Sequence, residues 1–158
     1  MTLLLAWPSQ KRTKSSGACC FLSHVVLVSA LAGLCQEIGD KYKIEVQLTG
    51  CDIRHNIPKD VALCLFRPAQ EPLVNLAKHS QALHADVVLG ANANGVSLRI
   101  KDDGKGFDIE ATKAGPGIGL VCMRERVRLV SGRLSISSQQ MVGTEILAEV
   151  PLQSPSEI

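Results

Sequence analysis

Residues 103–118 constrain the fold of this 158-residue chain more than any other segment. They contain a dense run of glycine together with proline, which helices and strands tolerate poorly, and so predict a long loop. A strand pattern enters the loop over residues 95–102, and a helical pattern leaves it over residues 119–131. Long ordered loops usually have a function, so this loop is the first candidate for a site.

The patterns on either side of the loop predict an alternating order of elements. Helices are expected at about residues 22–40 and 58–80, a strand at 43–48, and hairpins of strands at 87–89 with 95–102 and at 133–138 with 143–150. The Asn94-Gly95 dipeptide readily supplies the positive backbone angles of a tight hairpin. This order predicts an α+β fold, a two-layer sandwich in which helices cover one face of a mixed sheet.

Composition excludes several classes of protein. A formal charge of +2 and 3% aromatic residues argue against a nucleic-acid partner, while 46% hydrophobic residues suffice for the core of one domain. The six cysteines form no Cys-x-x-Cys pair and accompany no histidine cluster, so no zinc site is indicated. Reduced cysteines and a cytoplasmic location are the expectation.

The apolar run at residues 18–35 follows a basic stretch at residues 11–14 and could suggest a signal peptide or membrane anchor. Ser23, His24 and Ser29 interrupt the run, and no cleavage site is clear. A helix that is buried or packed against a partner is therefore favoured over a membrane span, and membrane association is expected only through missing or partner segments.

Glu71, Asn75 and His79 are spaced four residues apart in the long predicted helix, with Lys78 beside them. This spacing places the three side chains on one stripe. A carboxylate, an amide oxygen and cationic or imidazole groups in line could hold a hard metal ion and contact phosphate oxygens. Taken alone, the stripe is also typical of a solvated helix face, and that reading is favoured.

A second cluster, Asp102-Asp-Gly-Lys-Gly-Phe107, comes directly off the end of a predicted strand. Gly104 and Gly106 permit close approach of the backbone to a ligand, and a carboxylate at a strand end can accept a hydrogen bond from an exocyclic amine. An ordinary turn explains the same residues equally well.

Two further pieces lie towards the carboxyl end. Gly115-Pro-Gly-Ile-Gly-Leu120 runs into a predicted helix, whose free amides could bind phosphate, although a flexible connector is an equal alternative. No Gly-Lys-Ser/Thr follows, so it is not a Walker loop. Val142-Gly-Thr-Glu places the hydroxyl of Thr144 at the start of the last strand, where a plain hairpin start is the simpler reading.

Together, in this order, the motifs resemble the GHKL ATPase superfamily, and within it the ATP-binding domain of bacterial two-component sensor histidine kinases of the nitrate-sensor and degradation-sensor type. LFRPAQEPLVNLAKHSQA resembles their asparagine box, DDGKGF and GPGIGLVCMRERV their two glycine boxes, and GTEILAEVP their closing strand. The resemblance covers residues 25–152 and implies the Bergerat ATP-binding fold with ATP and Mg²⁺ as ligands.

The resemblance also implies roles for individual residues. Glu71 would act at the γ-phosphate with Lys78 and His79 near the phosphates, Asn75 would coordinate magnesium, and Asp102 would bind the adenine amino group. Gly104 and Gly106 would shape the adenine pocket, and Thr144 would support that pocket from the sheet. Gly115, Gly117 and Gly119 would form the phosphate lid, and Phe107 and Leu120 would be further ATP-binding residues.

The sequence departs from the family in two respects. Nothing before Asp40 resembles the dimerisation segment with its phosphoacceptor histidine, and His24 lies in an apolar run without an adjacent acid. Pro68 and Pro72 fall inside the helix that should present the stripe, where each interior proline costs about 3 kcal/mol. A kink is the mild expected outcome and a broken stripe the severe one.

The expected organisation is a disordered leader (1–20), a helix that links to a missing dimerisation and phosphoacceptor region (21–40), the kinase-like ATPase domain (41–152) and a tail (153–158). The leading hypothesis is a catalytic domain that passes the γ-phosphate of Mg-ATP to a histidine elsewhere, with a response regulator downstream. The alternatives are a truncated, non-catalytic kinase remnant or interaction module, and a stand-alone serine kinase of the anti-sigma type.

Overall fold

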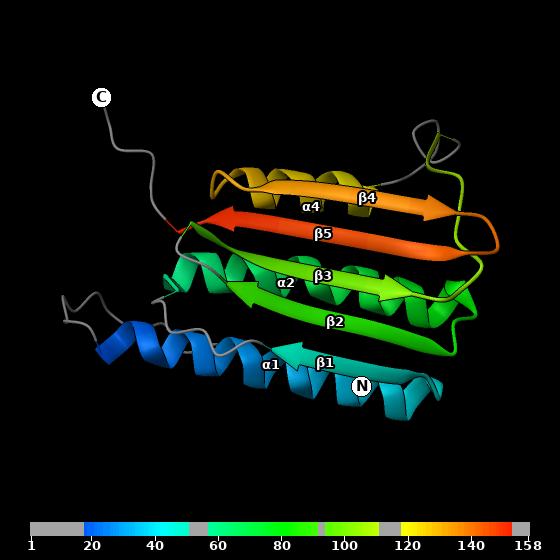
Figure 1. Cartoon of the computed structure of the whole chain (residues 1–158), viewed down its shortest axis with the longest axis horizontal. Helices are drawn as coiled ribbons and strands as arrows, with labels where there is room; N and C mark the ends of the chain where they lie inside the picture. The colour runs from blue at the N-terminus through cyan, green and yellow to red at the C-terminus, as the bar shows by residue number, and fades with distance from the viewer. Residues whose placement is uncertain (1–17, 51–56, 92–93, 111–117, 153–158) are drawn as a thin grey trace.

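The computed structural model describes residues 18–50, 57–91, 94–110 and 118–152, which form one sheet with helices behind it (Figure 1). The strands are β1 (Glu45–Gly50), β2 (His84–Ala91), β3 (Gly95–Asp102), β4 (Arg133–Gln139) and β5 (Gly143–Pro151). The helices are α1 (Ala18–Tyr42), α2 (Lys59–Asn75), the π-helical turn η1 (Leu76–Ser80) and α4 (Ile118–Arg128).

The sheet is five-stranded, in the order β1-β2-β3-β5-β4. β1 pairs with β2 in parallel, and every other pair of neighbours is antiparallel, so the sheet is mixed. Figure 1 shows the described helices together on one face of it. The predicted α+β fold with two layers is confirmed.

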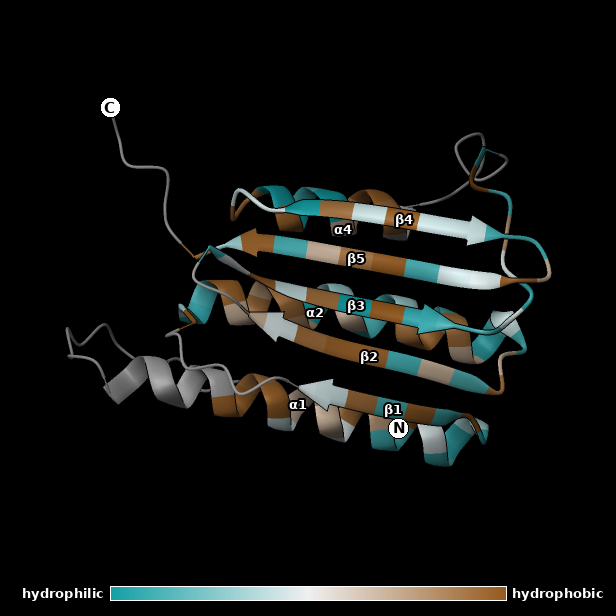
Figure 2. Cartoon of the chain, viewed as in Figure 1, coloured by the Kyte–Doolittle hydropathy of each residue, from teal (hydrophilic) through white to brown (hydrophobic). Residues whose placement is uncertain are grey.

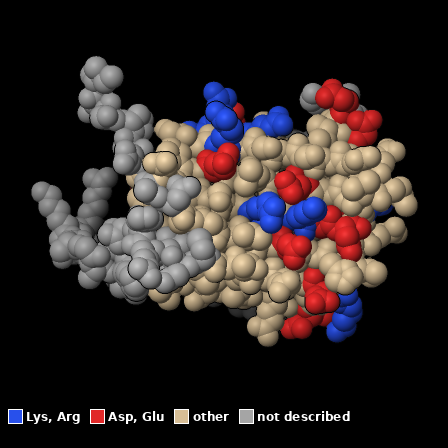
Figure 3. Space-filling model, viewed as in Figure 1, with Lys and Arg blue, Asp and Glu red and all other residues tan. Residues whose placement is uncertain are grey.

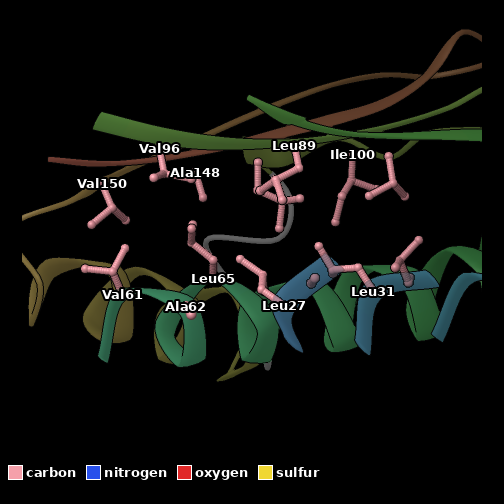
Figure 4. Close-up of a cluster of buried hydrophobic side chains, with 14 of the residues drawn as sticks. Leu27, Leu31, Val61, Ala62, Leu65, Leu89, Val96, Ile100, Ala148 and Val150 are labelled. Atoms are coloured by element: carbon pink, nitrogen blue, oxygen red, sulfur yellow. The ribbon is translucent and has the colours of Figure 1, made fainter. Parts of the chain in front are cut away.

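The core lies between the sheet and the helices, because the inward side chains of the strands alternate with polar ones (Figure 2). Val96, Leu98 and Ile100 of β3 are buried, as the alternation predicts. Val96 and Ile100 point toward the helices that carry Leu27, Leu31 and Leu65 (Figure 4). Burial of apolar surface at this interface supplies most of the stabilisation that holds the layers together.

The opposite face of the sheet is polar. Across its centre Asp86, Lys101 and Glu145 lie next to one another in register, so charges of opposite sign alternate across the strands. Figure 3 shows acidic and basic side chains intermixed on this face. Such a pattern suits a solvated surface and explains why the strands bury only one side.

Helix α1 is an integral part of the core. Leu27, Leu31, Cys35 and Ile38 recur at helical spacing and are buried, and the helix packs on α2 and β1. Among the described helices, none combines the length and the apolar content that crossing a bilayer requires. The packing of α1 on α2 and β1 is what the sequence favoured for this segment.

Pro68 and Pro72 do not break α2, so the severe outcome considered from the sequence is not found. Both prolines are buried, and their neighbours Leu65, Ala69 and Leu73 are completely inaccessible to solvent. Burying this apolar stripe against the sheet offsets the lost amide donors. The predicted helix over residues 58–80 is present, with its last turn wound as the π-helical η1.

Several element boundaries differ from the sequence expectation for local reasons. β1 begins two residues later than predicted because Lys43 takes a left-handed conformation with φ 59°, which reverses the chain after α1. β2 is longer than predicted, since parallel pairing with β1 begins at His84. After α4, Ser131 with φ 57° ends the helical run just before Gly132.

Candidate functional site

A cavity of about 180 Å³ opens between the helical layer and one end of the sheet. Its lining combines the predicted motifs from four parts of the chain. The lining residues are Pro72, Asn75, Leu76, His79 and Ser80 from α2 and η1, Ile100, Asp102, Thr144 and Ile146 from the sheet, Lys105, Gly106 and Phe107 from the loop after β3, and Leu120 and Met123 from α4.

Asp102 is the only buried polar or charged side chain in the part of the chain that the structure describes. Its Oδ1 accepts a hydrogen bond of 2.8 Å from the Gly104 amide. Burial raises the pKa of Asp102, and backbone hydrogen bonds from Gly104 and Thr144 oppose this rise. A buried carboxylate with access to a cavity is a costly feature that a complementary donor on a ligand would compensate.

The loop that follows Asp102 is fastened by backbone hydrogen bonds to both sides of the cavity. The Lys105 amide donates to the Ser80 carbonyl at 2.7 Å, and the Lys105 carbonyl accepts from the Met141 amide at 2.7 Å. The Phe107 amide donates to Ser138 Oγ at 2.9 Å. The loop therefore joins the end of η1 to the β4–β5 turn.

Ser138 supports Thr144 from the edge strand. Its hydroxyl lies 2.9 Å from Thr144 Oγ1 and donates to the Gly143 carbonyl at 3.2 Å. Thr144 is also the register partner of Asp102 across β3 and β5. Thr144, which lines the cavity, is thus held by a serine that the sequence motifs did not identify.

Both glycines of the first glycine box have no tolerable replacement. Gly106 has φ +61°, and a Cβ there would lie 2.1 Å from the Gln139 carbonyl oxygen. A Cβ on Gly104 would lie 2.5 Å from the Ser80 carbonyl oxygen and 2.8 Å from Asp102 Oδ1. The first glycine box therefore allows the loop to approach both the helix end and the β4–β5 turn.

Asp103 anchors the outer side of the same loop. Its carboxylate accepts hydrogen bonds from the amides of Leu83 and His84 and lies 2.7 Å from His84 Nδ1. The hydrogen bond with Asp103 raises the pKa of His84 above its ordinary value, and these bonds lower the pKa of Asp103. The two adjacent aspartates consequently have different environments, one facing the cavity and one facing solvent.

The helical wall contributes only part of the predicted stripe. Asn75 and His79 line the cavity, whereas Glu71 and Lys78 are not among the lining residues. Glu71 is half-buried one turn before Asn75, and Lys78 is exposed. Pro72, which the sequence analysis considered only as a residue that destabilises the helix, forms part of the cavity wall.

The second glycine box is described only in part. Gly115 and Gly117 lie outside the described residues, while Gly119 lies in the first turn of α4. Leu120 lines the cavity. The first turn of a helix offers free amides, so α4 begins with donors suited to an anion.

Sequence patterns missed Leu76, Ser80, Lys105 and Ser138 as site residues. Lys105 lies inside the DDGKGF motif, so its place between two required glycines was an available signal. Ser80 and Ser138 gave no signal, because serine is common at helix ends and in strands. Their contacts depend on residues far away in the sequence.

The chemistry of the cavity differs between its two ends. Asp102, Thr144 and apolar residues such as Ile100 and Met123 suit a flat, partly apolar group that carries a hydrogen-bond donor. Asn75 and His79, on the helical wall, offer an amide oxygen and an imidazole. A volume of about 180 Å³ is below the ~300–1,000 Å³ typical of whole ligands, so the cavity suits the base-sized part of a larger molecule.

Comparison with known proteins identifies the family that the sequence motifs resemble. Residues 61–154 match the family described as histidine kinase-, DNA gyrase B-, and HSP90-like ATPase. The chain is 37% identical over 119 residues to the signal transduction histidine-protein kinase/phosphatase DegS of Bacillus subtilis, covering 74% of this chain and 31% of DegS. It therefore spans about a third of that relative.

Solved structures show the same fold at low sequence identity. The ATP-binding domain of PrrB from Mycobacterium tuberculosis superposes with a TM-score of 0.61 and 18% identity, covering 81% of this chain and 95% of that one. The blue-light activated histidine kinase EL346 of Erythrobacter litoralis gives a TM-score of 0.67 and 17% identity, covering 80% and 42%. The resemblance inferred from the motifs is confirmed, and the chain belongs to the family of histidine kinase-, DNA gyrase B- and HSP90-like ATPases.

Proposed function

We propose that this chain binds Mg-ATP in the cavity and acts as the catalytic domain of a two-component sensor histidine kinase. The observation that carries the proposal is the buried carboxylate of Asp102 at the cavity, flanked by Thr144 and the first glycine box. A carboxylate there accepts a hydrogen bond from the exocyclic amine of adenine, which guanine lacks at the equivalent position.

The helical wall supports the phosphate end of the proposal. Mg²⁺ usually keeps several waters and binds through one or two protein oxygens plus substrate phosphates. The amide oxygen of Asn75 fits this requirement, and the described residues contain no group of three or more His, Cys, Asp or Glu side chains that would hold a metal independently. Mg²⁺ would neutralise charge on the phosphates when bound.

The remaining roles follow the same arrangement. His79 would contact the phosphates from the cavity wall, and Glu71 and Lys78, one on each side of Asn75 in the sequence, would reach them only after ATP is bound. Gly115, Gly117 and Gly119 would cover the phosphates together with Leu120. Positioning and electrostatic stabilisation would account for most of the catalysis, as is general for phosphoryl transfer.

The phosphoryl acceptor would be a histidine on a dimerisation and phosphoacceptor domain, with a response regulator as the next acceptor. This part of the proposal rests on the relatives, since the chain corresponds to about a third of DegS. A cytoplasmic location follows from the need for ATP and agrees with the free cysteines Cys35, Cys64 and Cys122.

Titration with a fluorescent ATP analogue tests the proposal. Saturable binding is expected in the presence of Mg²⁺, with reversal by EDTA and by unlabelled ATP but not by GTP. Asp102→Asn should weaken binding about 30-fold, as expected for a lost charged hydrogen bond. Asp86→Asn, on the exposed face of the sheet, is the matched control and should bind normally. Absence of saturable binding to the wild-type protein would overturn the proposal.

Transfer of label from ATP distinguishes the kinase classes. Incubation with a histidine phosphoacceptor domain and a response regulator should label both, in that order. Labelling of an anti-anti-sigma partner on serine would instead favour the stand-alone serine kinase, and binding without transfer to either would favour a non-catalytic module.

A further inference from the structure

We infer that Ser80 is a positioning residue that couples the helical wall of the cavity to the loop that carries Asp102. The inference rests on the proposed nucleotide site and adds to it a residue that does not act on the reacting atoms. Ser80 is the last residue of η1 and lines the cavity between His79 and Lys105.

The hydroxyl of Ser80 forms two hydrogen bonds at the end of η1. It donates to the Leu76 carbonyl at 2.6 Å and accepts from the Ala82 amide at 3.1 Å. Gln81, between Ser80 and Ala82, takes a left-handed conformation with φ 54°, which turns the chain toward β2. The Ala82 amide lies just past the end of η1, and the Ser80 hydroxyl gives it a partner while donating back to a carbonyl one turn earlier.

The backbone of Ser80 holds the loop. Its carbonyl accepts the Lys105 amide at 2.7 Å. Gly104 packs so closely against it that an added Cβ would lie 2.6 Å from Ser80 Cβ. Because the Gly104 amide donates to Asp102 Oδ1, a continuous set of contacts runs from Leu76 through Ser80 to the buried carboxylate.

This arrangement fixes the separation of two parts of the site. η1 follows Asn75 directly and carries His79, on the proposed phosphate side, while the loop carries Asp102, on the proposed base side. Alanine at position 80 would keep the backbone carbonyl but leave the helix end without its hydroxyl. The carbonyl would then be less well fixed, and so would the loop that it holds.

The experiment compares Ser80→Ala, Ser80→Thr and Ser135→Ala with the wild type. Threonine retains a hydroxyl that can bond to the carbonyl four residues earlier. Ser135 is exposed on β4 and serves as the matched control. Two quantities are measured: amide hydrogen exchange at Lys105 and Ala82 in the nucleotide-free protein, and affinity for the fluorescent ATP analogue with Mg²⁺.

Ser80→Ala should accelerate exchange at both amides and weaken analogue binding about tenfold, the effect of one lost hydrogen bond. Ser80→Thr should restore both quantities, and Ser135→Ala should change neither. Wild-type exchange at Lys105 in Ser80→Ala would overturn the inference, as would wild-type affinity in that variant. Exchange is measured without nucleotide, so it tests Ser80 even if the wild-type protein fails to bind ATP and the proposed function is wrong.

Discussion

The two ends of the cavity, named here base end and phosphate end after the proposed nucleotide, differ in how firmly the protein holds them. At the base end, Asp102, Gly106 and Thr144 are fixed by register, backbone hydrogen bonds and close packing. At the phosphate end, Asn75 and His79 are exposed, and neither side chain forms a hydrogen bond with another described residue. The base end is preformed, whereas the phosphate end consists of side chains that a charged ligand would have to organise.

The largest effect is expected from disturbing the preformed end. Gly106→Ala should lower the free energy of unfolding by about 3 kcal/mol, because it combines a positive φ with a clash against backbone. Urea denaturation measures this value. Gly33→Ala is the control: nothing lies within 4 Å of the added Cβ, so it should stabilise the protein by up to about 1 kcal/mol. Equal stability of the two variants would show that the base end is not rigid.

Asn75→Ala tests the other end. Affinity for Mg-ATP should fall about tenfold, as expected for one lost contact to the metal or phosphates. Affinity for adenosine should not change, because adenosine has no phosphate, and the urea midpoint should not fall, because Asn75 is exposed and alanine favours the helix. Isothermal titration with the two ligands measures the difference. An equal loss for both ligands would place Asn75 at the base end and remove the distinction.

Asp102→Asn separates binding from stability at the preformed end. Burial raises the folded-state pKa of Asp102, so the folded protein binds that proton more tightly and loses stability as pH rises from the unfolded pKa through the folded one. The variant lacks this loss and should be more stable than the wild type at neutral pH. Urea denaturation between pH 3.5 and 7 should show that the difference in free energy of unfolding between variant and wild type grows with pH. A difference that stays constant would contradict this prediction.

The smallest effect is expected at the solvent side of the loop. The hydrogen bond with Asp103 raises the pKa of His84. The stability that this pair contributes is therefore present below the unfolded pKa of histidine, about 6.5, and is lost as pH rises through the folded pKa. The lowered pKa of Asp103 means that the contribution is also lost at acidic pH. His84→Asn should flatten the dependence of the melting temperature on pH in this window, and an unchanged profile would show that the pair is without effect.

Much of the fold could be predicted because the patterns are local. The strand pattern over residues 95–102 contains the alternating residues Val96, Leu98 and Ile100, which are buried. The helical pattern over residues 119–131 contains Met123 and Val127, which are buried in α4. The prolines in α2 show the limit of this reasoning. Helix propensity includes the destabilisation that each proline causes. It does not include the stabilisation from burying Leu65 and Leu73, which depends on tertiary packing.

The site shows the same division. Motif order brought Asn75, Asp102 and Thr144 into one hypothesis, and all three line one cavity. Glu71 and Lys78 belong to the same motif as Asn75 but do not line the cavity. The direction in which each side chain points around α2 and η1 decides which of them face the cavity. Spacing defines a stripe on a helix, whereas the packing of that helix decides where the stripe points.

The sequence by itself determined the identity of the elements, their order and the residue types available for nucleotide chemistry, because periodicity and glycine placement are properties of short segments. Only the tertiary structure decided that Ser80 and Ser138 support the cavity and that Asp102 is buried while Asp103 is exposed. These outcomes depend on contacts between residues such as Ser80 and Lys105, which are brought together by packing of the helical layer on the sheet.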